Sequence, residues 1–551
     1  MAGSPTTTAI GSVSITATSI ETNALFKSVE AAVKSLSTSD VKLYSGTGVI
    51  PGPTATGQVL VLGANATGNL NIPQGYAYVV AGPGSTATLS GGSAATTIVG
   101  DNFNYTGNAA KVVSGNGNST IVDGFANAEI VIGSGGRSTV TAGGANQVVH
   151  VGETGTASIA ATGSGDTIVA FTGSRTSISA LGDNQTVSIA SQGAASVTSA
   201  GNNQTIDVQA GAAVQIVTDG SGDTVNIGSG PAAAALRGQA VPAPAPLFSS
   251  VVQSQAGSRT TYNVTDAGSL NELVLGTADT VNASAGISTI FGLVADRVMA
   301  SNLGQVYFVG GAGTSTIFGG AANATVFAST AQVFDLGSAQ GNVFVGGTGA
   351  STINAGSGGG TFFGGTAGDQ YNFGTGGAQV FLGLGGADTL GGGGGTVAPI
   401  IFATGAEHMT ITASSRPVTV VSFANGGSVD TSATGGNNDF FAGYGVGGNQ
   451  TLIGSALGVD SMGAATRDQF VVGANAAGTP ASIAIENWHA GDVFYLTGFT
   501  AADNATMDTA IANSVGSGAK GDLSFTLGDN TTITFVGKHP TAFDATTNSA
   551  F

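Results

Sequence analysis

The sequence predicts an all-β protein built as a parallel β-solenoid, a β-roll-like stack of coils of about 19 residues in two stacks. Apolar residues recur every nineteen residues in two series offset by nine. A fixed period near 20 residues is typical of a solenoid, whose repeats bury their apolar faces against their neighbours. The first series is Ile121, Val140, Ile159, Ile178, Val197 and Ile216. The second is Ile130, Val149, Ile168, Val187, Ile206 and Val225.

Two columns between these series predict the turns of each coil. Only Asn and Gly occur three residues before the second series, and both tolerate a left-handed backbone, so this column predicts a turn with φ > 0. Its members are Asn127, Asn146, Gly165, Asn184, Asn203 and Gly222. A second column of small residues predicts the opposite corner. It comprises Gly117, Gly136, Gly155, Ser174, Gly193 and Ala212.

Composition and charge limit the classes of function. The 551 residues include 92 glycines, 8% charged residues and no cysteine, and the formal net charge is −18. A chain this acidic is repelled by phosphate backbones, so we expect no nucleic-acid partner. The lack of cysteine excludes disulfides and thiolate metal sites.

The chain divides into five predicted segments. Residues 1–48 form an N-terminal segment with a helix from Thr18 to Ser37, whose Thr18–Glu21 start fits a capping box. We expect this helix to cover the first open coil, and docking of a partner is the alternative. Residues 49–228 form the first solenoid, and the proline- and alanine-rich stretch 229–262 is a linker or an excursion.

Residues 263–465 are predicted to form a second solenoid, in which glycine and phenylalanine are frequent. A thicker core explains the phenylalanines, and an aromatic strip for glycan stacking is the alternative. Exposure of Phe318, Phe344 and Phe363 would favour the glycan interpretation. The last segment, 466–551, loses the repeat and predicts a compact module, with a helix at Ala501–Val515 and a hairpin around Gly528–Asn530.

The second half of the chain resembles a known family. Gly364–Asp369 and Gly383–Leu390 resemble the glycine- and aspartate-rich nonapeptides of RTX proteins, which form calcium-filled β-rolls. The tail, with Trp488, Gly491–Phe494 and Leu527–Phe535, resembles C-terminal regions of type I secreted members. The resemblance covers about residues 276–551. It implies an extracellular or cell-surface bacterial protein, and an uncleaved C-terminal signal would account for the absence of an N-terminal signal from Met1–Ile20.

Calcium is the one cofactor that this resemblance implies. In the regular stretch the column that would hold the family's carboxylates is mostly neutral, so we expect the first solenoid to close by stacked amides without metal. The column reads Ala128, Gln147, Asp166, Gln185, Gln204 and Asp223. In the second region Asp279, Asp369, Asp388 and Asp439 are candidate calcium ligands, and local turn formation is the alternative for each.

No catalytic site is predicted. The four histidines lack metal-ligand spacing, and no nucleophile elbow or phosphate loop stands out. The densest polar cluster comprises Glu486, Trp488, His489 and Asp492, and burial of Trp488 beside a turn explains it without a reaction.

These observations favour a secreted bacterial structural protein that self-associates into a filament, surface layer or matrix, because open strand edges template the addition of another chain. The partner is then the protein itself. The alternative is a calcium-dependent adhesin or glycan-binding protein, with cell-surface polysaccharide as partner. A polysaccharide-modifying enzyme would need a groove of charged residues, for which there are few candidates. No apolar stretch reaches the length of a membrane-spanning helix.

Overall fold

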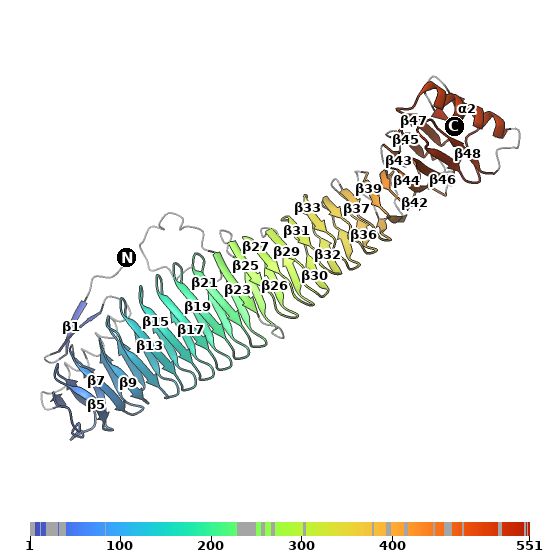
Figure 1. The fold of residues 1–551 in the computed structure, drawn as a ribbon. Coiled ribbons are helices and arrows are strands. Elements are labelled where there is room, and N and C mark those ends of the chain that lie inside the picture. Colours follow the sequence, from blue (N-terminus) through green and yellow to red (C-terminus); the bar gives the residue numbers. More distant parts are fainter. Residues whose placement is uncertain are drawn as a thin grey trace. The chain divides into compact units, whose positions relative to one another are not determined.

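The computed structural model confirms the predicted parallel β-solenoid (Figure 1). It describes residues 6–10, 13–17, 31, 40–82, 84–228, 249–254, 259–265, 270–300, 305–376, 379–392, 398–412, 417–444, 447–456, 466–475, 479–515, 521–544, 547 and 549–550. The chain divides into a first unit, Met1–Thr289, and a second unit, Ile290–Phe551. Strand β27 (Ile287–Phe291) spans the division.

The first unit contains two parallel sheets that alternate along the chain. One sheet is formed by β3 (Val41–Tyr44), β4 (Gln58–Leu62), β6 (Tyr76–Ala81), β8 (Thr97–Gly100), β10 (Lys111–Ser114), β12 (Glu129–Ile132), β14 (Val148–Val151), β16 (Thr167–Ala170), β18 (Thr186–Ile189), β20 (Thr205–Val208), β22 (Thr224–Ile227), β24 (Thr261–Val264) and β26 (Thr280–Ala283). The other is formed by β5 (Thr67–Ile72), β7 (Thr86–Gly91), β9 (Asn104–Gly107), β11 (Thr120–Asp123), β13 (Arg137–Ala142), β15 (Thr156–Ala161), β17 (Arg175–Ala180), β19 (Ala194–Ser199), β21 (Ala213–Thr218), β23 (Ser249–Ser254) and β25 (Leu270–Val274). Separately, β1 (Thr6–Ile10) and β2 (Val13–Ala17) pair antiparallel.

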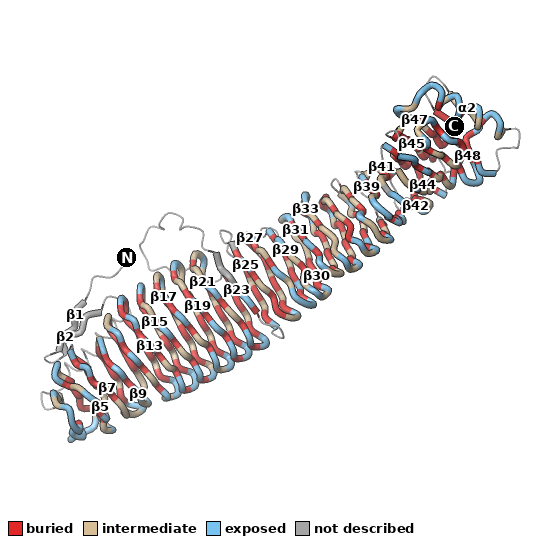
Figure 2. Tube along the Cα trace, viewed as in Figure 1, coloured by how far each residue is buried: buried red, intermediate tan, exposed pale blue. Residues whose placement is uncertain are grey.

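The register confirms the nineteen-residue coil. Ile159 lies beside Ile178, and Val187 beside Ile206, each pair nineteen residues apart. These side chains are buried between the sheets, and their neighbours along the strand face outward (Figure 2). Burying one such side chain stabilises the fold by about 1.5–3 kcal/mol, so the repeated apolar column is the main source of cohesion between coils.

Both predicted corners are present. All six residues of the Asn and Gly column have positive φ, from 56° at Asn203 to 79° at Gly222. At the second corner the left-handed residue precedes the small column by one position, as at Thr154 and Gln192. The small residue itself is needed for space, because a Cβ on Gly136 would lie 2.0 Å from the carbonyl oxygen of Gly117.

Some predicted segments differ from the structure or lie outside it. The helix predicted from Thr18 to Ser37 falls outside the described residues, apart from residue 31, as do residues 229–248 of the predicted linker. Within that linker, however, β23 pairs with β21 and β25, so the ladder continues through Ser249–Ser254. The long insertion therefore lies between two neighbouring coils.

The second unit also contains two sheets of parallel strands. One is formed by β28 (Arg297–Ala300), β30 (Ser315–Phe318), β32 (Gln332–Leu336), β34 (Thr352–Ala355), β36 (Gln370–Phe373), β38 (Thr389–Gly392), β40 (His408–Thr412), β42 (Gly427–Ala433), β44 (Gly448–Ile453), β46 (Ala481–Glu486) and β49 (Thr532–Phe535). The other is formed by β29 (Gln305–Val309), β31 (Ala324–Phe327), β33 (Asn342–Val345), β35 (Gly360–Phe363), β37 (Gln379–Gly383), β39 (Ile400–Gly405), β41 (Thr419–Ala424), β43 (Asp439–Gly443), β45 (Gln469–Gly473) and β47 (Val493–Thr497).

The coil length of the second unit varies, which hides the period in the sequence. Ser315 pairs with Gln332, seventeen residues on, and Thr389 pairs with Thr410, twenty-one residues on. Beyond residue 466, where the sequence loses its repeat, parallel pairing persists: Asp439 lies beside Gln469 across a thirty-residue coil. Insertions lengthen the loops and leave the strands in register.

The C-terminal end of the second unit is closed by different elements. Strand β48 (Leu523–Thr526) pairs antiparallel with β49, and β51 (Ser549–Ala550) pairs antiparallel with both β47 and β50 (Phe543–Asp544). The predicted helix is present as α2 (Ala501–Val515), which packs against β48 and β50. The predicted hairpin is the β48–β49 turn, where Asn530 has φ 67°.

Candidate functional site

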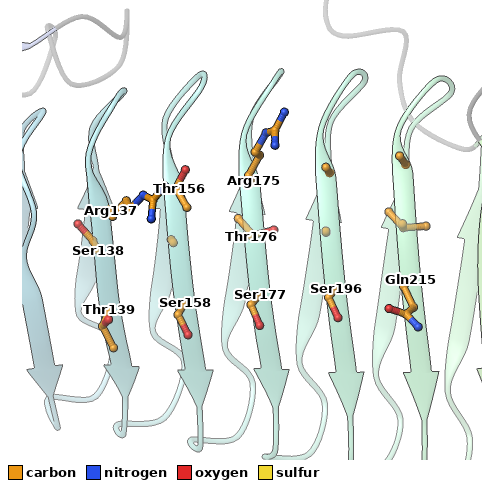
Figure 3. A pocket seen from close by; sticks show the side chains of 15 residues that line it. Arg137, Ser138, Thr139, Thr156, Ser158, Arg175, Thr176, Ser177, Ser196 and Gln215 are labelled. Carbon is orange, nitrogen blue, oxygen red and sulfur yellow. The ribbon is translucent and has the colours of Figure 1, made fainter. Parts of the chain in front are cut away.

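A shallow groove of about 680 Å³ crosses the outer face of β13, β15, β17, β19 and β21 in the first unit. Figure 3 shows side chains that project from these five neighbouring strands. Small residues leave the space that forms the groove. Ala194 and Ala213 occupy the positions that Arg137, Thr156 and Arg175 hold on the other strands. The groove therefore follows the stacking direction of the coils.

Two arginines give the groove a positive charge. Arg137 and Arg175 are both exposed, and neither guanidinium has an ion-pair partner within the described part of the chain. In Figure 3 Arg137 reaches toward Thr156, whereas Arg175 extends toward the turn before β17. The whole chain has 13 basic and 31 acidic residues, so two unpaired cations on one face are a local exception to its acidity.

A row of polar side chains runs beside the arginines. Thr139, Ser158, Ser177, Ser196 and Gln215 occupy equivalent positions on successive strands. Adjacent strands lie roughly 4.8 Å apart, so the row presents a hydrogen-bonding group at that interval.

Two hydroxyl groups at buried strand positions beneath the groove lack a hydrogen-bond partner among the described residues. Ser138 is 4% exposed and Thr176 is 7% exposed, and both residues line the groove. Neither Ser138 Oγ nor Thr176 Oγ1 has a hydrogen bond to another described residue. Both atoms are covered by the protein, so they do not contribute hydrogen-bonding groups to the groove.

The buried residue that precedes each even-numbered strand forms what we term the corner column. In the first unit it includes Gln147, Asp166, Gln185, Gln204, Asp223 and Asp279, all at most 1% exposed. In the second unit it includes Ser351, Asp369, Asp388 and Glu407. Of the four predicted calcium ligands, the structure places Asp279, Asp369 and Asp388 in this column.

The column carboxylates accept hydrogen bonds from backbone N–H groups. Asp369 Oδ1 accepts from Ser351 N at 2.6 Å, and Asp369 Oδ2 accepts from Gly365 N at 2.9 Å. Asp279 Oδ1 accepts from Thr260 N and its Oδ2 from Gly276 N, both at 2.7 Å. Asp388 Oδ1 accepts from Asp369 N at 2.7 Å. Each carboxylate thus satisfies an amide of its own turn or of the preceding coil.

The prediction that stacked side-chain amides close the first solenoid is wrong for the corner column. Gln185 Nε2 donates to the carbonyl oxygens of Ala161 and Gly163, at 3.0 and 2.6 Å. The backbone carbonyl oxygens of the tight turn need hydrogen-bond donors. The Gln185 amide donates to carbonyl oxygens of the preceding coil and not to the glutamine of the next coil. A ladder of side-chain amides occurs instead on the outer face, where Asn263 Nδ2 donates to Asn226 Oδ1 at 2.7 Å.

The fourth predicted calcium ligand lies elsewhere. Asp439 begins β43, in the other sheet, and is half-buried. Burial, followed by the nearby Asp468 carboxylate, raises the pKa of Asp439. No group of three His, Asp or Glu side chains that could hold a metal occurs among the described residues. The contacts of Asp279, Asp369 and Asp388 are those of the turn-forming alternative, and calcium binding stays a prediction.

Asp388 and Glu407 form a buried acidic pair on successive coils. Glu407 Oε2 accepts from Gly385 N at 2.8 Å. Burial is the largest cause that raises the pKa of both carboxyl groups. Coulomb repulsion from Glu407 also raises the pKa of Asp388, and repulsion from Asp369 raises that of Glu407, whereas a hydrogen bond with Asp388 lowers the pKa of Glu407. Asp369, one coil before Asp388, adds to the repulsion on Asp388.

The polar cluster around Trp488 has the packing expected if its role is to bury Trp488 beside a turn. Trp488 is 4% exposed, and its ring lies 5.2 Å from that of Phe535. Asp492 accepts from the backbone N–H groups of Asp468 and His489, at 2.8 and 2.7 Å. Burial raises the pKa of Asp492 to about 6.

The phenylalanines of the second unit mostly fill its interior. Phe344, Phe362 and Phe381 are at most 1% exposed, and Phe381 lies 4.3 Å from Tyr371 between ring centroids. Phe318 and Phe363 are half-buried. These positions favour a thick core over a continuous aromatic strip.

The sequence analysis missed the groove, although a signal was present. Arg137 and Arg175 lie in one outward-facing column of the repeat, two coils apart. That column contains no acidic residue from β13 to β21.

Within the described segments, no helix has the length and apolar character needed to cross a membrane. Comparisons with protein-family models, with curated proteins and with solved structures found no match.

Proposed function

We propose that this chain is a structural protein of the extracellular bacterial type, which associates with other copies of itself through the N-terminal end of its first unit. The observation that carries the proposal is that, among the described residues, both sheets end there in a strand with one unpaired edge. Strand β3 pairs only with β4, and β5 pairs only with β7, among the described strands. An unpaired strand edge is a template for another chain.

The two ends of the chain differ in this respect. Antiparallel strands and α2 close the C-terminal end of the second unit, which disfavours addition of another chain there. Association through the N-terminal edge alone would join two copies end to end by a two-fold axis. A filament would need a further contact.

The first coil also exposes apolar surface. Leu43 is 65% exposed and Val49 is 91% exposed. Tyr44 O accepts from Gly63 N, so in a parallel ladder the backbone N–H of Leu43 faces away from β4 and toward the open edge.

Analytical ultracentrifugation over a hundredfold range of concentration tests the proposal. We expect a reversible dimer that Leu43→Lys weakens at least tenfold, because a lysine on an exposed edge strand disfavours pairing with another strand. Leu181→Lys, at a 48% exposed leucine away from the edge, is the matched control and leaves the dimer intact. A wild-type protein that stays monomeric at every concentration would contradict the proposal.

Secretion by a type I route and calcium binding within residues 263–465, by Asp279 of the first unit and by Asp369, Asp388 and Asp439 of the second, are further proposals that rest on the resemblance alone. The calcium proposal has a direct test. If calcium binds there, the melting temperature of the chain should fall in chelator and recover when calcium is added. Equal melting temperatures with and without chelator would count against it.

A further inference from the structure

The groove of the first unit has the features of a site for an extended anionic chain. It runs along the stacking direction, carries two unpaired guanidinium groups and presents a row of polar side chains beside them. We propose that it binds a linear acidic polysaccharide, whose sugar carboxylates pair with Arg137 and Arg175. This inference goes beyond the self-association proposed above and uses a different surface.

The spacing of the arginines favours a periodic ligand. Arg137 pairs in register with Thr156, and Thr156 with Arg175, so the two guanidinium groups originate two coils apart. Two coils correspond to roughly 10 Å along the solenoid. This interval is comparable to the length of a disaccharide in an extended polysaccharide, where alternate sugars present their carboxylates to the same side. Arginine is well suited to this role, since its planar fork binds a carboxylate through two hydrogen bonds.

The row of hydroxyl groups suits the rest of a sugar chain. Thr139, Ser158, Ser177 and Ser196 can each donate and accept a hydrogen bond, as sugar hydroxyls do.

The composition of the groove disfavours other polyanions and neutral glycans. No aromatic side chain lines it, so it lacks the stacking platform that single-stranded nucleic acids use. Neutral sugars would gain nothing from the two arginines. The net charge of −18 further opposes a nucleic acid, whose phosphates outnumber two guanidinium groups.

Isothermal titration calorimetry with polygalacturonate, using the full chain, tests the proposal. We expect binding in 50 mM salt that weakens at least fivefold in 0.5 M salt, because exposed ion pairs are screened. Dextran of matched length, which has no carboxylates, should not bind. Arg137→Gln with Arg175→Gln should weaken binding at least tenfold, and the corresponding double lysine variant should retain part of it.

A charge-matched control separates the groove from general electrostatics. Arg259→Gln with Arg297→Gln removes the same charge outside the groove and should leave the affinity unchanged. Circular dichroism melting of each variant establishes that the solenoid is intact. Leu43→Lys should also bind polygalacturonate normally, so failure of the self-association proposal would not be mistaken for failure of this one.

Three outcomes would overturn the proposal. The first is absence of binding to polygalacturonate at low salt. The second is equal affinity of the wild type and the groove variant. The third is loss of dimerisation in the groove variant when the wild type itself binds no glycan, which would make the groove an interface between copies of this chain.

Discussion

The corner columns of the two units do the same mechanical task with different chemistry. In the first unit, Asp166 and Asp223 are separated by the glutamines Gln185 and Gln204, so no two carboxylates lie on successive coils. In the second unit, Asp369, Asp388 and Glu407 occupy three successive coils. The column side chains satisfy backbone groups at the corner in two ways: the carboxylates accept from N–H groups, and the glutamines of the first unit donate to carbonyl oxygens. The difference lies in how pH affects each unit.

Protonation links the acidic column to stability. Burial raises the pKa of Asp388 and Glu407 above their ordinary values of 3.8 and 4.5, so the folded unit retains protons that the unfolded chain releases. Their stabilising contribution is therefore complete below about pH 4 and is lost as pH rises through the folded pKa values. The isolated Asp166 behaves in the same way, with a pKa raised to about 6, but no carboxylate on an adjacent coil adds to the effect.

The largest expected effect comes from making the first unit resemble the second. Gln185→Glu places a carboxylate one coil after Asp166 in a buried column, and an uncompensated buried charge costs about 3 kcal/mol or more. We expect a lower urea midpoint at pH 8 and a smaller loss at pH 5, where the new carboxyl group is protonated. Thr198→Glu, on the exposed outer face, is the control and should change little at either pH. An equal loss at both pH values would show that charge is not the cause.

The two units should lose similar stability when a methyl group is added at a closely packed glycine. A Cβ on Gly182 would lie 1.8 Å from Gly163 O, and one on Gly365 would lie 2.0 Å from Gly347 O. Both glycines are the second residue after an odd-numbered strand. Alanine at either position should destabilise its unit by about 2 kcal/mol, as overpacking does. Gly52→Ala, which meets no atom within 4 Å, is the neutral control. Thermal melting of the three variants makes the comparison, and a large effect at one unit alone would contradict it.

Replacing one carboxylate of the acidic pair should make the pH dependence of the second unit's stability resemble that of the first. Asp388→Asn keeps an oxygen that can accept from Asp369 N and eliminates one of the three buried carboxylates on successive coils. At pH 8 we expect stabilisation of about 1.4 kcal/mol, the equivalent of one pKa unit, and at pH 4 little change. Melting temperatures at the two pH values measure this. Destabilisation at pH 8 would indicate that the carboxylate has a required partner, such as the predicted calcium ion.

The smallest effect concerns the turn before the corner. Asn184 has φ 57°, whereas the equivalent Ala387 of the second unit has no left-handed conformation. Asn184→Ala should cost about 1 kcal/mol, and Asn184→Gly should cost almost nothing, because only the first introduces left-handed strain. Ala387→Gly is the matched variant of the second unit and should show no gain from relieved strain. Equal effects of the two Asn184 variants in urea unfolding would contradict this explanation.

The nineteen-residue period and the Asn and Gly column were sufficient to predict the fold of the first unit. Both depend on local rules, namely which residues are buried and which accept positive φ. The second unit was harder because loops of different length shift the spacing, and Gln469 pairs thirty residues after Asp439. The hydrogen bonds of the corner column depend on which atoms face one another across coils. Residue type alone could not tell that Gln185 donates to backbone carbonyls.

Hydrogen exchange measured by mass spectrometry at pH 5 and pH 8.5, corrected for intrinsic rates, tests the contrast between the corner columns most directly. We predict that strands β34 to β40 of the second unit lose more protection at pH 8.5 than strands β14 to β22 of the first. Asp388→Asn should abolish most of that difference. Equal changes in both sets of strands, or a greater loss in the first unit, would contradict the account.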